Sequence, residues 1–551
     1  MLIFLISVAR AGDDFEDSRF FYGDIHSHTG ASGDGGSADL GSCINFSTGA
    51  PASCGNVADI GTTARANGLD FLSTVDHVTS AQATTTEADF LQVFHLVDSL
   101  NDPAHEFITL PGAEDFVELP DGSDVGHRSL IFFGDSASLT GLTRVDAEPS
   151  GSISNDVADC SALTTFMDGL TARFGPALLL PHHPGVKKPM ATDWACFDPT
   201  YEPLVEVYSE HGSSMSAGST FDIPWSGYQP SGTVQTALDP AGFSLRFGFG
   251  AGSDNHDTHP GQTCGIDTVQ DQPYGSGITV VFQPSTASFD RTAIYDAFME
   301  RRTYASTGPH VPLVVEARLT DGTVLGGMGE AVEFATGQDL VVEARMPAST
   351  FPDVVEVVAV GPAGSWPLVA GVKGTWTATI PALEVPEHLF VDVELDASVL
   401  WPDGCEDGGA DTFDHLWSSP IWFDPTGTDA DGDGWTVEEG DCDDKNDKVN
   451  PGAMEACGRD VADQDCDGIP ASEDPDCIDD TGVDTGTDTA ETGGDTAEDS
   501  APPVVIPDDT GSGLTGPLAT HRCACDAGGA GAFGLAAAGA ALLVTMRRRR
   551  P

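Results

Sequence analysis

The chain is poor in basic residues. Lys and Arg number 23 against 87 Asp and Glu, which gives the 551 residues a formal net charge of −64. The acidity is uneven, because 28 acidic and 3 basic residues lie within 424–510 alone. Nucleic-acid partners need a basic footprint for their phosphates, and docking on anionic membranes also needs basic residues. The composition therefore excludes both kinds of partner.

A second absence concerns the 12 cysteines, none of which forms a C-x-x-C pair. This excludes a thioredoxin-type motif and a zinc ribbon. Near pairs are Cys43 and Cys54, Cys160 and Cys196, and four cysteines lie between 442 and 477. An even number of cysteines in a non-cytosolic chain predicts disulfides, although their connectivity stays open.

The two ends predict export. The positively charged n-region of a signal peptide is missing, but residues 2–8 are apolar and Ala9-Arg10-Ala11 fits a small-x-small cleavage site. Residues 1–11 therefore predict a signal peptide, with an apolar first strand as the alternative. Residues 527–546 carry no charge and precede four arginines. This length just spans a bilayer, with the arginines on the cytoplasmic side.

Residues 12–310 alternate short apolar runs with crossover-length segments. The runs are 20–25, 71–75, 107–110, 129–133, 177–180, 204–208 and 245–250, and 294–302 has the pattern of a closing helix. Runs spaced in this way predict parallel strands with helices outside. The fold class expected is α/β, a β/α barrel.

The rest of the chain divides by composition. Residues 311–424 contain five strand-like runs, and Val342, Ala344 and Met346 alternate with charged residues as in a half-buried strand, so a small β-sandwich is expected. Residues 425–478 form a compact module rich in Asp and Cys. Residues 479–522, acidic and poor in apolar side chains, are expected to be a disordered linker.

Nearly every predicted barrel strand carries a metal-type side chain at one end. These are His26, His28, Asp76, His77, Glu114, His127, His182, His183, Glu206, His211, Asp254 and His256. The carboxyl ends of parallel barrel strands converge on one face. Each residue alone fits a core histidine or a surface turn, but the joint pattern predicts a metal centre. Mixed His, Asp and Glu ligands suit Zn, Mn or Fe, and the lack of cysteine argues against a structural zinc site.

Six ordered motifs resemble the PHP (polymerase and histidinol phosphatase) superfamily. They are GDIHSHTGASGDG, STVDHV, PGAED, GHRSL, LPHHPG and AGSDNH. The segments LVEVYSEHGSS, GSDNHDTHPG, RRTYASTG and LWSSPIWF are similar to the DUF3604 branch of that superfamily, and the resemblance covers about residues 20–424. It implies a distorted seven-stranded β/α barrel, TIM-like, that holds two or three divalent transition metals.

The resemblance also implies ligands. His26, His28, Glu114 and Asp254 would hold a first metal; Glu114, His127 and a histidine of the fifth strand a second; His77, His256 and Asp34 a third. Asp34 stands where relatives use His, which leaves the third site open. His182 is favoured on the fifth strand, with His183 as the alternative.

The reaction expected from the resemblance is hydrolysis of a phosphomonoester or phosphodiester. A water shared by two ions would be the nucleophile. Asp76 would orient that water or a ligand histidine. Arg128 and Lys187 are candidate phosphate contacts, with plain surface charge as the alternative. Glu206 and His211 are candidates for substrate binding or proton donation.

A second metal-type element begins at residue 429. Asp429, Asp431 and Asp433 have the D-x-D-x-D-G spacing of a calcium loop, and Asp441 lies near enough to contribute. Position twelve is Gly440, so the loop departs from an EF-hand. GDCDDKNDKVNPGAMEAC and DQDCDG resemble the MopE-type metal-binding motif, which implies calcium, with copper as the alternative. The alternative interpretation of this segment is a solvated acidic spacer.

The C-terminal segment 523–551 resembles myxobacterial sorting signals. It has Cys523-Ala524-Cys525, an apolar stretch and an arginine cluster. The resemblance implies a sorting protease as partner and display on the surface of a Gram-negative cell; a plain tail anchor is the alternative. Two other functions stay open: a non-catalytic surface-binding protein or adhesin on the same scaffold, and a metallohydrolase of C–N or C–O bonds.

Overall fold

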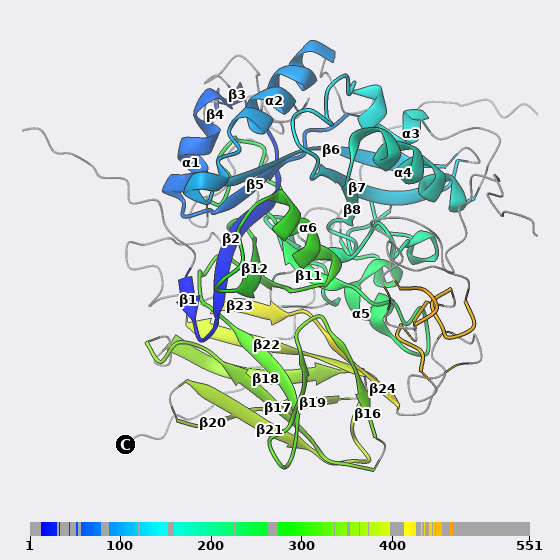
Figure 1. The fold of residues 1–551 in the computed structure, drawn as a ribbon. Coiled ribbons are helices and arrows are strands. Elements are labelled where there is room, and N and C mark those ends of the chain that lie inside the picture. The colour runs from blue at the N-terminus through cyan, green and yellow to red at the C-terminus, as the bar shows by residue number, and fades with distance from the viewer. Residues whose placement is uncertain are drawn as a thin grey trace, which may run out of the picture. The chain divides into compact units, whose positions relative to one another are not determined.

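A computed structural model gives the fold (Figure 1). It describes residues 13–29, 32, 43–44, 51–52, 57–78, 87–119, 122–152, 159–188, 190–217, 219, 221, 223, 227–262, 274–335, 337–349, 353–362, 364–372, 374–396, 413–425 and parts of 431–469. The predicted signal peptide, the linker and the C-terminal segment lie outside these residues. No helix in the described part is both long and apolar enough to cross a bilayer.

One large sheet runs through the molecule. Its strands, in spatial order, are β16 (Ala331–Phe334), β24 (Ile421–Pro425), β22 (His388–Asp396), β23 (Phe413–Ser418), β13 (Thr303–Ser306), β12 (Ile278–Pro284), β2 (Ser18–Ser27), β5 (Phe71–Thr74), β6 (Ile108–Glu118), β7 (Asp124–Phe132) and β8 (Ala177–Pro181). Beside this path, β1 (Asp13–Phe15) pairs with β2, and β18 (Val354–Gly361) joins β22 to β19 (Gly364–Pro367). The fold is mixed α/β and consists mostly of strands.

All seven apolar runs expected in residues 12–310 form strands. The last two belong to a separate sheet of β10 (Gly212–Ser213), β9 (Leu204–Ser209) and β11 (Gly248–Ala251). A short pair, β3 (Cys43–Ile44) and β4 (Pro51–Ala52), stands apart. The predicted strands are therefore present, but two sheets share them.

The expected closed TIM-like barrel does not form among the described strands. β2, β5 and β6 are parallel, but β7 pairs antiparallel with both β6 and β8. β12 pairs antiparallel with β2 from Ser18 to Gly23 and so occupies the edge of β2 that closure would need. A strand edge carries one row of hydrogen-bonding groups, and it is the segment after β11 that meets the end of β2, through the isolated bridge between Ser27 and Asn255.

Helices cover the large sheet. They are α1 (Ile60–Ala66), α2 (Glu87–Ser99), α3 (Pro149–Ser152), α4 (Ser161–Phe174), α5 (Val234–Leu238) and α6 (Arg291–Met299). The helix expected at 294–302 is α6, and it starts earlier because the Asp290 side chain accepts a hydrogen bond from the Ala293 amide at 2.9 Å, a capping contact. Apolar side chains of α4 pack on β6, β7 and β8, and those of α6 on β2, β5 and β6.

A second sheet layer lies below the large sheet in Figure 1. Its order is β15 (Val324–Gly327), β14 (Val314–Leu319), β17 (Leu340–Arg345), β21 (Thr375–Ile380) and β20 (Val369–Ala370). In β17, Val342 and Ala344 are buried and Glu343 and Arg345 half-buried, as the alternation predicts. The buried face shares one apolar core with Val391 and Val393 of β22.

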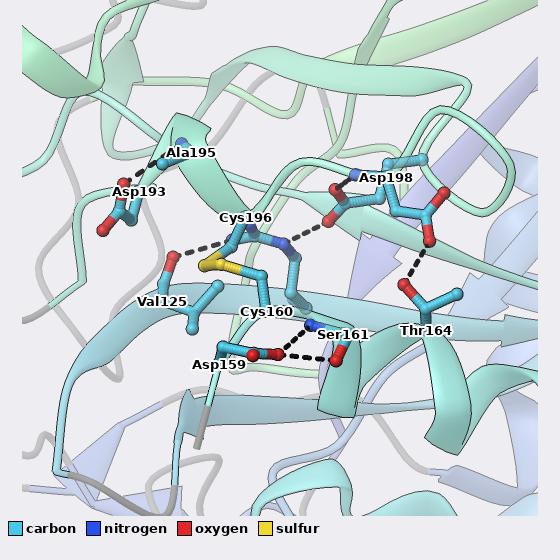
Figure 2. Close-up of a disulfide and its surroundings, with 11 residues drawn as sticks. Val125, Asp159, Cys160, Ser161, Thr164, Asp193, Ala195, Cys196 and Asp198 are labelled. Atoms are coloured by element: carbon cyan, nitrogen blue, oxygen red, sulfur yellow. Dashed lines mark hydrogen bonds and ion pairs between the residues drawn. A yellow bond between two sulfur atoms is a disulfide. The ribbon is translucent and has the colours of Figure 1, made fainter. Parts of the chain in front are cut away.

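A disulfide ties α4 to the chain that follows β8. Cys160, directly before α4, is bonded to Cys196, which lies 36 residues later in the short helix Trp194–Cys196 (Figure 2). Beside it, the Thr164 hydroxyl donates to Asp198 at 2.6 Å, and the Asp193 amide donates to the Val125 carbonyl at 2.9 Å. The cross-link therefore fixes the segment after β8 against both α4 and β7.

Candidate metal centre

The metal-type side chains predicted at the strand ends meet in one buried cluster. The members, each at most 5% exposed, are His26, His28, His77, Glu114, His127, His182, His183, His211, Asp254 and His256. Parallel bridges between Ser27 and Asn255 and between His77 and Glu114 draw the strand ends together. Within three overlapping groups, all ligand atoms lie within 4.8 Å of one another: Glu114, His127, His182 and His183; His28, His77 and His256; and His26, His28, Glu114 and Asp254.

Glu114, in the middle of β6, is the centre of the cluster. Its Oε1 lies 2.7 Å from His127 Nδ1 and 3.0 Å from His182 Nε2. Its Oε2 lies 3.0 Å from His28 Nε2 and 3.3 Å from His26 Nε2. One carboxylate therefore faces two sets of imidazoles, one with each oxygen, which is the arrangement of a group shared by two metal ions.

Asp254, after β11, is the second carboxylate. Its Oδ1 lies 3.2 Å from His26 Nε2 and 3.3 Å from His28 Nε2, and its Oδ2 lies 2.8 Å from His211 Nε2. Its backbone has φ of 56°, a strained conformation for a residue other than glycine. Gly252 lets this segment approach β2, because a Cβ there would lie 2.4 Å from His26 Cβ.

The side chains present fit divalent transition metals. His127 Nδ1 and His182 Nε2 are buried and make no hydrogen bond of acceptable geometry, although both lie close to Glu114 Oε1. Buried ring nitrogens normally find a hydrogen-bond partner. A metal ion binds such converging nitrogen and oxygen lone pairs in place of hydrogen bonds. A combination of imidazole and carboxylate ligands suits Zn, Mn or Fe.

Outer hydrogen bonds orient the imidazoles. Glu206, fully buried in β9, lies 2.8 Å from His26 Nδ1, so its carboxylate fixes the tautomer that presents Nε2 to the cluster. The Ser129 hydroxyl lies 3.1 Å from His182 Nδ1, and the Ser32 hydroxyl lies 2.9 Å from His28 Nδ1. Sequence reasoning missed both serines. Strand alternation puts Ser129 on the face of His127, which could have indicated it, whereas nothing in the loop indicated Ser32.

Asp24 is a further buried carboxylate that the sequence did not single out. Its Oδ1 accepts from the amides of His26 and Ser253 at 3.1 and 2.9 Å, and its Oδ2 from Gly261 at 3.0 Å. It therefore ties the end of β2 to the segment that carries Asp254. The motif GDIHSH contains Asp24, but no local signal distinguishes it from a strand residue.

Burial and carboxylates act against each other on the pKa values in the cluster. Burial lowers the pKa of His28, but hydrogen bonds to Asp254 and Glu114 outweigh it and raise the pKa to about 10. Burial lowers the pKa of His182 to about 3 in spite of Glu114. Burial raises the pKa of Glu114, but the imidazoles of His77 and His182 hold it well below its usual range. A metal at His28 must displace a proton, so metal binding should weaken at low pH.

The other predicted site residues differ in their surroundings, because some are buried and one is exposed. Asp76 is buried and accepts from the Thr29 amide and hydroxyl at 2.6 and 2.8 Å, so it holds the loop after His28. Glu206 is fully buried and hydrogen-bonded to His26. Lys187 is exposed, and Asp34 lies outside the described residues.

The prediction of a phosphate contact for Arg128 is not supported by its position. Its side chain is fully buried, and its Nε donates to Glu202. Its Nη1 donates to the carbonyls of Val125 and His127 at 3.3 and 3.0 Å. Neighbours along a strand point to opposite faces, so Arg128 turns away from the cluster that His127 joins.

The Asp/Cys module is described in part. Cys442 and Cys466 form a disulfide, the Asp441 side chain is 2% exposed, and its Oδ1 accepts from the Asp443 amide at 2.8 Å. Asp431 is among the described residues, whereas Asp429 and Asp433 are outside them. The predicted disulfide bonding of this module is thus confirmed for one pair.

Comparison with known proteins finds one family match. Residues 441–470 match the MopE family described as "Putative metal-binding motif". No curated protein and no solved structure matches the chain. The predicted MopE-type resemblance is confirmed for this segment: the chain carries a metal-binding motif of that family, and the cluster around Glu114 is a second place where a metal would fit.

Proposed function

We propose that the protein is an exported, surface-attached metal-dependent hydrolase of the PHP type, and that it acts on phosphoesters. The observation that carries this proposal is Glu114, whose two oxygens face two sets of imidazoles. The disulfides of Cys160 with Cys196 and of Cys442 with Cys466 favour an oxidising compartment. Export by the N-terminal segment, and sorting by a protease that acts on the C-terminal one, are part of the proposal.

The residues have separate roles in this mechanism. Two divalent metals held here would supply Lewis acidity and a water of lowered pKa for hydrolysis. Glu114 would be shared by the two ions, Asp254, His26 and His28 would hold one of them, and His127 with His182 or His183 would hold the other. His77 and His256, with His28, offer a third place.

The remaining groups orient or move protons. Glu206 keeps the His26 proton on Nδ1, which leaves Nε2 free to bind. His211, 2.8 Å from Asp254 Oδ2, is placed to hold a proton on Nε2 for the leaving oxygen. Burial of these side chains would keep bulk water away from the metals.

The test uses the full chain purified from an oxidising compartment. We expect two or three transition-metal ions per chain by elemental analysis, and turnover of p-nitrophenyl phosphate or bis(p-nitrophenyl) phosphate. The matched control, His26→Ala with Asp254→Ala, should lose both ions and turnover. Metal without phosphoester turnover would move the protein to hydrolysis of C–N or C–O bonds. Less than one ion per chain, after reloading with Zn and Mn, would favour a non-catalytic surface-binding protein.

We also propose that the Asp/Cys module binds calcium and not copper. Its segment 425–478 contains no histidine, and two of its cysteines are joined in a disulfide, so few soft ligands remain. Buried Asp441 offers carboxylate oxygen, which suits a hard cation. Calorimetry should show calcium binding that Asp441→Asn weakens about tenfold or more, with Asp460→Asn as the matched control. Copper binding without calcium binding would overturn this assignment.

A further inference from the structure

The arginines of the folded body are already used in ion pairs. Nearly all of those in described residues lie within 4.0 Å of a carboxylate: Arg19 with Glu106, Arg65 with Asp102, Arg128 with Glu202, Arg144 with Glu148, Arg173 with Asp146, Arg246 with Asp424, Arg291 with Asp98, Arg302 with Glu300, Arg318 with Glu316 and Arg345 with Glu16. The exception, Arg301, donates to the Gly329 carbonyl and lies over Trp422. No described arginine is thus left to balance a substrate's charge.

The lysines, and the segments outside the described residues, add little positive charge. Lys187 and Lys188 are exposed. The gaps between residues 13 and 425 contain one basic residue, Lys373, which belongs to the sandwich segment between β20 and β21. The chain therefore has no buried ammonium or guanidinium to offer a phosphoryl group at the cluster, in the part that the structure describes.

Carboxylates, by contrast, surround the cluster. Three of them are each at most 3% exposed: Asp24, Asp76 and Glu206. Asp24 accepts from the His26 amide, and Asp76 accepts from the Thr29 amide in the loop after His28. Glu206 is hydrogen-bonded to the His26 ring. Glu114 and Asp254 within the cluster already neutralise part of the charge that the ions bring. Apart from exposed Lys187, only the charge that remains on the ions would balance a substrate's negative charge, and each added negative charge is repelled by the nearby carboxylates of Asp24, Asp76 and Glu206.

From this charge distribution, and resting on the proposed function, we infer that the substrate is a phosphodiester, which carries one negative charge, and not a dianionic phosphomonoester. In the reaction, a bond forms from the water oxygen to phosphorus and the bond from phosphorus to one ester oxygen breaks. The leaving oxygen takes up one proton of the water and departs as an alcohol, and the other proton passes to solvent. The product is a phosphomonoester with two charges, which the same carboxylates disfavour, so the reaction stops after one ester bond.

The experiment compares bis(p-nitrophenyl) phosphate with p-nitrophenyl phosphate at pH 8, using the metal-loaded full chain. We expect kcat/KM to be at least about tenfold higher for the diester, which corresponds to about 1.4 kcal/mol, because the carboxylates repel the second charge of the monoester. We also expect one nitrophenolate per diester, with p-nitrophenyl phosphate accumulating. Equal or faster turnover of the monoester, or release of both nitrophenolates, would overturn the inference.

A binding measurement separates this inference from catalysis. Dimethyl phosphate should raise the melting temperature of the metal-loaded protein more than methyl phosphate does at pH 8, and neither should do so in the variant with His26→Ala and Asp254→Ala. A larger shift with methyl phosphate would contradict the inference even if the diester is hydrolysed. If neither ester is bound or turned over, the proposed phosphoesterase function fails, which is a distinct result.

Discussion

Replacing Glu114 by Gln should lower the metal content of the cluster and strongly slow hydrolysis. The change keeps the shape of the side chain but removes the charge and puts an amide NH₂ where one of two acceptor oxygens stood. Both oxygens face imidazole nitrogens, at 2.7 and 3.0 Å for Oε1 and at 3.0 and 3.3 Å for Oε2. Two groups of ligand atoms contain Glu114. In the proposed function two ions share this carboxylate, so its loss should lower turnover by about 10²- to 10³-fold.

The measurement is ion content and turnover on one preparation, with Glu118→Gln as the matched control. Glu118 lies on the same strand and is exposed, so its substitution should leave both unchanged. Circular dichroism checks that the Glu114 variant is folded. A folded variant that keeps the full ion content would show that metals, if present, are held elsewhere. A variant that loses ions but retains turnover would separate the metal centre from the activity.

Removing the Cys160–Cys196 disulfide should cost the body about 4 kcal/mol of unfolding free energy. The cross-link closes a loop of 36 residues, and the loop-closure entropy of that length gives this value. The bond also joins the start of α4 to the segment that follows His183. Within that segment, the Thr192 amide donates to the Pro184 carbonyl at 3.1 Å.

The variant is Cys160→Ser with Cys196→Ser, unfolded by urea. Reduced wild-type protein, which loses the Cys442–Cys466 disulfide as well, should be destabilised at least as much. We expect the ion content at 25 °C to be retained, because Cys196 lies in the segment after β8 and contributes no atom to the cluster. A loss below about 1 kcal/mol would mean that the unfolded chain is already held compact by other contacts. Loss of ions with unchanged stability would instead assign the disulfide a role at the metal centre.

Much of the fold could be predicted from the sequence because it depends on local burial. The runs 20–25 and 71–75 are mostly apolar, and β2 and β5 are buried accordingly. The alternation of Val342 and Ala344 with Glu343 and Arg345 likewise matches the two faces of β17. The types of side chain at the strand ends also come from the sequence alone, as do the cysteines and the MopE-type motif.

The tertiary structure alone decided how the strands pair. β12 is separated from β2 by some 250 residues, yet it takes the edge of β2 that a closed barrel would use. The sequence of β2 does not contain that information, since an edge pairs with whichever strand reaches it with satisfied hydrogen bonds on both sides. Pairing of β7 with β6 and β8 in antiparallel fashion is decided in the same way.

The roles of individual site residues also depended on tertiary contacts. The sequence left His182 and His183 as alternatives, and the structure brings both within reach of Glu114. It turns Arg128 toward Glu202, and it sets Glu206 behind His26. A sequence determines which groups a strand end carries and thus the kind of chemistry that could be expected. Which nitrogen meets which oxygen is fixed only when strands distant along the chain pack together, because hydrogen bonds and ion pairs act over a few ångströms in space.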